Sequence, residues 1–136
     1  MLRSPMTFLN VDLEIQTAAD PASLAAELEG KALLLYCGPF HDDYLINIES
    51  HHHAADADNR INDLCNIVES LSPSSRDLWK NALRRELDAG FEATPTHEAF
   101  AVAISSSTLR RMASLDVSFA ITIYPPEATR AHQDQA

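Results

Sequence analysis

The sequence is poor in glycine, and this shortage excludes several kinds of catalytic site. Its 136 residues include only three glycines, so it has no glycine-rich loop of the kind that cradles phosphate groups. The serines at 105–107 lack the flanking glycines of a hydrolase nucleophile elbow, and they are typical of a helix N-cap. The residues form no convincing active site, so we expect a protein that is not an enzyme and that needs no cofactor.

Cysteines and long apolar runs are also scarce. The only two cysteines, Cys37 and Cys65, fall at positions that we predict to face the core. This placement favours free thiols in a reducing cytoplasm, although the spacing leaves a disulfide between them open. No apolar run is long enough to span a membrane, and residues 1–15 are too polar for the core of a signal peptide. We therefore expect a cytoplasmic protein with no membrane partner.

Basic residues are half as frequent as acidic ones. Ten Lys and Arg residues stand against 20 Asp and Glu residues, which gives a formal net charge of −10. Most of this charge lies in residues 1–75, which hold far more acidic than basic residues. A field of this sign repels phosphate backbones and attracts positive surfaces. The composition therefore excludes nucleic acid as a partner and favours a basic protein.

Hydrophobic periodicity predicts strand–helix–strand units near both ends of the chain. Apolar residues alternate with polar ones in several segments, and others repeat at helical spacing behind a capping residue. The predicted strands are 8–16, 31–37, 44–50, 84–93, 97–104 and 117–124, and the predicted helices are 20–30, 56–71, one restarting at 72, and 105–115.

This order predicts an α+β fold. We expect a two-layer sandwich, with one mostly antiparallel sheet of about six strands and three or four helices on one face, including ferredoxin-like βαβ elements. The length predicts one domain, which we place over residues 6–124, followed by a disordered tail over 125–136. An open sheet leaves edge strands, so a homodimer through one of them is also left open.

Acidic residues gather at outward positions of the predicted strands. Outward positions of the strand over 84–93 hold Glu86, Asp88 and Glu92. The predicted partner-binding residues are Asp12, Glu14, Asp42, Asp43 and Glu49. This pattern indicates a non-enzymatic protein-interaction module that binds a basic protein, and the alternative is an ordinary solvated sheet face.

Three consecutive histidines offer a second functional hypothesis. His51 and His53 could share one face of a strand end, and Asp56 and Asp58 follow closely. Imidazole nitrogen and carboxylate oxygen are ligands for zinc or nickel. The alternative function is therefore a small-ligand or metal-binding domain that uses these four residues, although the usual spacing of a structural zinc site is missing.

The last fifty residues resemble a known bacterial domain family. The strand over 100–104, the serine-capped helix over 105–115 and the strand over 117–124 resemble the closing segment of the domain-of-unknown-function 4279 family. Trp79 and the break at Leu71-Ser72-Pro73 also fit this resemblance. The family has no established activity, so the resemblance implies no site residues. Small acidic domains of this kind look like immunity proteins that neutralise toxins, and an immunity-like role is one version of the interaction module.

Overall fold

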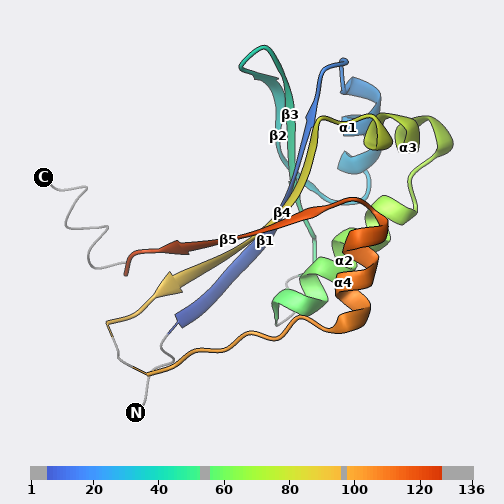
Figure 1. Cartoon of the computed structure of the whole chain (residues 1–136). Coiled ribbons are helices and arrows are strands. Elements are labelled where there is room, and N and C mark those ends of the chain that lie inside the picture. The colour runs from blue at the N-terminus through green and yellow to red at the C-terminus, as the bar shows by residue number, and fades with distance from the viewer. Residues whose placement is uncertain (1–5, 53–55, 96–97, 127–136) are drawn as a thin grey trace, which may run out of the picture.

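A computed structural model describes residues 6–52, 56–95 and 98–126. Over these residues the chain has an α+β fold with one mixed five-stranded sheet and four helices (Figure 1). The strands are β1 (Met6–Thr17), β2 (Leu33–Phe40), β3 (Asp43–Glu49), β4 (Arg84–Ala93) and β5 (Ser118–Tyr124). The helices are α1 (Ala22–Glu29), α2 (Ala57–Glu69), α3 (Pro73–Lys80) and α4 (Ser106–Ser114). The α+β prediction is confirmed, and residues 127–136 of the predicted tail lie outside the described residues.

The strands follow the order β2-β3-β1-β4-β5, with β1 at the centre. Neighbouring strands are antiparallel, except that β4 and β5 are parallel. Both ends of the chain therefore form a βαβ unit, as the periodicity predicts. In the first unit, β3 is inserted between β1 and β2. In the second unit, α4 connects the adjacent strands β4 and β5.

One face of the sheet carries the hydrophobic core. On β1 the odd-numbered residues Val11, Leu13 and Ile15 are fully buried, while the even-numbered residues between them are partly exposed. In Figure 1 the four helices lie to one side of the sheet, and each buries apolar residues in the same core. This alternation leaves the opposite face of the sheet to polar side chains.

The predicted strand over 97–104 is wrong: the described residues 98–104 form no strand, so the sheet has five strands and not about six. Since β4 and β5 are parallel neighbours, the chain must return to the other end of the sheet between them, and the segment before α4 makes part of this return (Figure 1). Two of the alternating apolar residues of this connection pack inward: Phe100 contacts Phe91 with ring centroids 5.9 Å apart, and Ile104 packs against the core, whereas Val102 is 45% exposed. The alternation in this segment therefore arises because the segment packs on the sheet, although it is not a strand of that sheet.

The connection between β2 and β3 is shorter than the sequence predicts. Instead of a loop of about six residues, two residues link the strands, and His41 takes a positive φ of 54°. β2 continues through Gly38 and Pro39, which is possible because β2 is an edge strand and a proline there removes no hydrogen bond from the ladder. The expected burial of Cys37 is also wrong: Cys37 is exposed on this edge, whereas Cys65 is buried, and both thiols are free.

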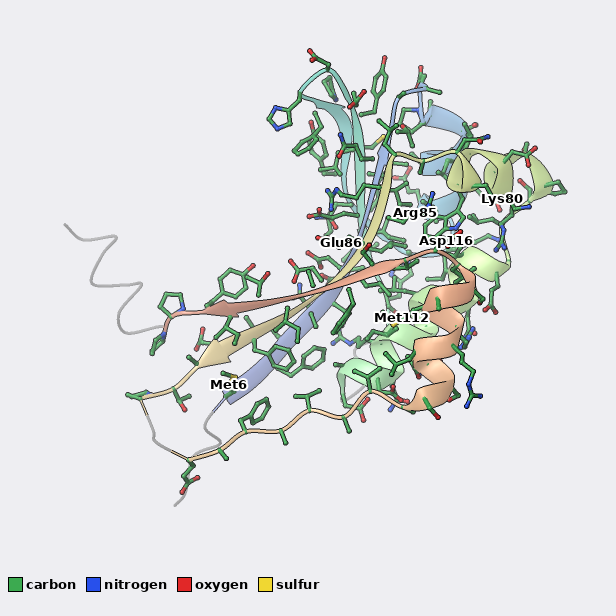
Figure 2. The ribbon with its side chains drawn as sticks, in the orientation of Figure 1. Met6, Lys80, Arg85, Glu86, Met112 and Asp116 are labelled. Atoms are coloured by element: carbon green, nitrogen blue, oxygen red, sulfur yellow. The ribbon has the colours of Figure 1, made fainter. Side chains whose placement is uncertain are left out.

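Arg85 joins the ends of two helices. Its side chain lies between Lys80, at the end of α3, and Asp116, which follows α4 (Figure 2). The guanidinium group donates to the carbonyl oxygens of Trp79 at 2.8 Å, Ala82 at 3.1 Å and Asp116 at 3.0 Å. These bonds satisfy carbonyl groups that a helix end leaves without partners.

Candidate functional site: an acidic row on the open sheet face

Three carboxylates lie side by side across the centre of the open sheet face. Asp12 of β1 pairs directly with Glu49 of β3 on one side and with Asp88 of β4 on the other. We call these three residues the acidic row. Residues directly opposite each other on antiparallel strands have Cβ atoms about 4.5–5.5 Å apart, and like charges there are destabilising. The fold therefore holds three acids together at a cost in stability.

Neutral donors partly compensate this charge. The side-chain amide of Asn10 donates to Asp12 Oδ1 and to Glu49 Oε2, both at 3.1 Å. The hydroxyl of Thr122 on β5 lies 2.9 Å from both carboxylate oxygens of Asp88. Hydrogen bonds of this kind orient the carboxylates without neutralising them.

Glycine at position 90 leaves room for this arrangement. A Cβ atom on Gly90 would lie 2.9 Å from the side-chain oxygen of Asn10. Any larger residue there would push aside the amide that bridges Asp12 and Glu49.

The acidic row changes the protonation of its central member. The pKa of Asp12 is raised from its ordinary value of 3.8 to about 6. The largest cause is burial, because loss of solvent disfavours the charged form, followed by repulsion from Glu49 and a hydrogen bond with it. Repulsion from Asp88 and Glu14 adds to the shift. At neutral pH Asp12 is therefore mostly ionised, although it binds a proton more tightly than an ordinary aspartate does.

The neighbouring row of the sheet is partly neutralised. Glu14 pairs across the strands with Glu86, and Arg84 reaches both carboxylates, at 2.8 Å and 3.3 Å. By contrast, the ion pairs that the described residues make with one another do not include Asp12, Glu49 or Asp88. The negative charge of the acidic row is thus left without a basic partner in this part of the chain.

The predicted partner-binding residues separate into two places. Asp12 and Glu49 belong to the acidic row, and Glu14 lies in the next row. Asp42 lies exposed in the turn between β2 and β3, and Asp43 begins β3 and accepts a hydrogen bond from the Gln16 amide at 3.1 Å. At about 3.3 Å per residue, the turn is roughly 20 Å from Glu49 along β3, so these two aspartates do not extend the row.

The predicted metal ligands have other contacts. Asp56 caps α2 by accepting from the Asn59 backbone N–H at 2.8 Å, and Asp58 accepts from the Ser105 backbone N–H at 3.0 Å. His51 is exposed, and His53 lies outside the described residues. Over 6–52, 56–95 and 98–126, no group of three or more His, Cys, Asp and Glu side chains could hold a metal ion. Metal binding at this position stays a prediction.

The sequence patterns do not identify Asn10 or Asn47 as site residues, and the predicted partner-binding residues do not include Asp88. All three stand at outward positions of their strands, so alternation places them on the open face. The missing information is strand order, because only the pairing of β1 with both β3 and β4 brings Asp88 beside Asp12. The Oδ1 atom of Asn47, opposite Glu14, is buried and has no hydrogen-bond partner among the described residues.

Replacing Asp12 with asparagine should stabilise the fold at neutral pH. The pKa of Asp12 is higher in the folded protein, at about 6, than its ordinary value of 3.8. Its contribution to stability is therefore complete below about pH 4 and is lost as the pH rises through about 6. We expect a gain of about 1–2 kcal/mol for Asp12→Asn at pH 7, which is less than a fully buried site would give because solvent screens this partly exposed group.

Urea unfolding of both proteins between about pH 4 and pH 8 measures this effect. The difference in free energy of unfolding should widen from about pH 4 to pH 6 and then stay constant. A difference that is the same at every pH would contradict a raised pKa for Asp12.

Comparisons with known proteins add no function. No family model, curated protein or solved structure matches this chain, so the resemblance to the domain-of-unknown-function 4279 family stays a prediction. In the part of the chain that the structure describes, no helix is both long and apolar enough to cross a membrane.

Proposed function

We propose that this protein is a non-enzymatic interaction module whose open sheet face binds a basic partner protein. The observation that carries the proposal is the acidic row, in which three adjacent carboxylates lie at the centre of the sheet. A lysine or arginine side chain placed over Asp12 would supply the positive charge that these residues lack. Binding would then relieve the repulsion between Asp12, Glu49 and Asp88, which destabilises the free protein.

Further features of the face support a basic partner. The net charge of −10 attracts positive surfaces over a distance and raises association rates. The six carboxylate oxygens of the acidic row meet only the Asn10 amide and the Thr122 hydroxyl as side-chain donors among the described residues, and a side chain bearing several N–H donors suits such a surplus of acceptors. An immunity-like protein that neutralises a basic toxin is one concrete version of this function.

This proposed function requires that the sheet and the helices form two layers. In that arrangement the chain itself does not cover the acidic face, and a partner can reach it. The proposed function also places the protein in the cytoplasm, in agreement with its two free cysteines. A homodimer is compatible with both points, since an edge strand and a sheet face are separate surfaces.

Binding of an oligoarginine peptide tests the role of the acidic row. We expect isothermal titration calorimetry to detect binding to the wild type and an affinity at least about tenfold lower for the Asp12→Asn/Glu49→Gln variant, since tenfold corresponds to about 1.4 kcal/mol. Binding should also weaken as salt rises, and as the pH falls below about 6 and Asp12 takes up a proton.

A variant with the same change in net charge is the control. Glu29 and Asp77 are exposed on helices away from the acidic row, so Glu29→Gln/Asp77→Asn should bind the peptide about as well as the wild type. Equal losses in the two double variants would show that net charge alone attracts the peptide. That result would overturn the assignment of the binding site to the acidic row.

A further inference from the structure

An apolar groove lies beside β5, on the side of the sheet that faces the helices. Phe119, Ile121 and Ile123 of β5 are 38%, 59% and 54% exposed, and they line the groove together with Phe100 and Val102 of the connection that precedes α4. The β5 residues pair in register with Leu87, Ala89 and Phe91, which are buried on β4. Figure 1 shows β5 running away from the helices, so the core-facing side of the sheet continues into an open apolar strip.

β5 is also an unprotected edge strand. It ends the strand order, so one side of its backbone has no neighbouring strand among the described residues. Soluble proteins usually protect such edges with charged residues, prolines or bulges. Residues 118–124 contain no charged residue and no proline, and the pairing with β4 is regular.

The opposite edge is protected in this way. β2 has a bulge between Leu34 and Tyr36 and carries Pro39, which has no N–H to donate. The two edges therefore differ in their ability to accept another strand, and β5 is the better acceptor. If β5 paired with β2 of another molecule, each pair would still have one free β5 and one free β2, and further molecules could add without limit. Pairing of β5 with β5 uses the same strand of both molecules and therefore gives a closed dimer.

We propose that β5 pairs antiparallel with β5 of a second copy of this chain, so that a twofold axis passes through Ile121 and the two apolar strips merge. This register uses all seven residues of the strand. It places Ile121 opposite Ile121 of the second copy, and Phe119 opposite Ile123. Every pair on the groove side is then apolar, which is the arrangement that stabilises cross-strand contacts.

β5 adds no charge to an interface between two molecules that each carry −10, because residues 118–124 contain no acidic or basic residue. Asp88 and Glu92 lie on the neighbouring strand β4, and Asp116 lies two residues before β5 begins. Across the dimer, the two β4 strands would be three strand spacings apart, or about 14 Å at about 4.8 Å per spacing. This separation exceeds the Debye length of about 8 Å at physiological salt, so repulsion there is largely screened.

Solution mass tests the dimer directly. Sedimentation equilibrium of the full chain over a range of concentrations should give twice the monomer mass of 15.0 kDa. The Ile121→Lys variant should be monomeric, because it buries two facing charges at the axis. Leu35→Lys, at a similarly exposed position on β2, should remain dimeric. A monomeric wild type at all concentrations, or a dimer that only Leu35→Lys disrupts, would overturn the proposal.

Disulfide formation tests the register with variants that keep the edge uncharged. In a Cys37→Ser background, Ile121→Cys should form a covalent dimer on oxidation with diamide, because the two sulfurs face each other across the axis. Ile123→Cys is the matched control: its two copies would be four residues apart along the strands, or about 13 Å, and should not link. Equal linking of both variants, or linking of Ile123→Cys alone, would contradict this register.

Discussion

Replacing Trp79 with alanine is expected to lower the free energy of unfolding by about 3–5 kcal/mol, the usual cost of removing a buried tryptophan. Trp79 is 2% exposed and is the bulkiest of the fully buried side chains. Its indole N–H donates to the carbonyl oxygen of Leu115 at 3.3 Å, so it links α3 to the end of α4. The substitution leaves a cavity beneath α3 and an unpaired carbonyl at the end of α4.

Chemical unfolding followed by far-UV circular dichroism measures this loss. Fluorescence does not serve, because Trp79 is the only tryptophan in the chain. Trp79→Phe keeps most of the ring but removes the N–H, so it should cost less than alanine. Leu83→Ala, at a position 57% exposed, should change stability by less than about 0.5 kcal/mol. A Trp79→Ala variant as stable as Leu83→Ala would mean that α3 does not pack on the core.

The Arg85→Met variant should be destabilised by about 2–3 kcal/mol, since hydrogen bonds from a charged donor contribute about 1.5–3 kcal/mol each and part of the loss is recovered by water. Methionine keeps much of the aliphatic length but donates no hydrogen bond. It would leave the carbonyl groups after α3 and α4 without their shared partner. The guanidinium group also lies 5.8 Å from the centre of the Trp79 ring, so the two substitutions should not be additive.

Arg84→Met is the matched control for Arg85→Met. The two arginines are consecutive on β4, but Arg84 lies on the open face, where it pairs with Glu14 and Glu86. Surface ion pairs of this kind contribute about 0–1 kcal/mol. Comparable losses in the two variants would indicate that the contacts of Arg85 with the helix ends contribute little.

Much of the fold can be predicted from local sequence patterns. The alternation in residues 11–16 reflects the one buried face of β1, and the serines at 72 and 105 cap α3 and α4 as expected. The predicted inward position of Leu9 is wrong, because a bulge between Phe8 and Asn10 leaves Leu9 39% exposed and packs Phe8 against the core instead. The extra strand over 97–104 is predicted wrongly, because a connection that packs on a sheet has the same alternation as a strand within it. The short turn at His41 is missed because a positive φ is uncommon at any residue other than glycine.

The site is predicted less completely than the fold, because it depends on strand order. Alternation places Asp12, Glu49 and Asp88 on outward positions, but it does not indicate that β1 lies between β3 and β4. The raised pKa of Asp12 follows first from burial and then from the neighbouring carboxylates. Local patterns therefore predict which residues face outward, and tertiary pairing decides which of them act together.

The central position of β1 has a consequence for the newly made chain. β1 is synthesised first among the strands, yet one of its two neighbours is β4, which ends at Ala93. At about 5–20 residues per second, a ribosome needs roughly 4–15 s to make the 75 or so residues between the end of β1 and the end of β4. During that interval one edge of β1 has no partner from its own chain, so this protein should depend on chaperones most while it is being translated.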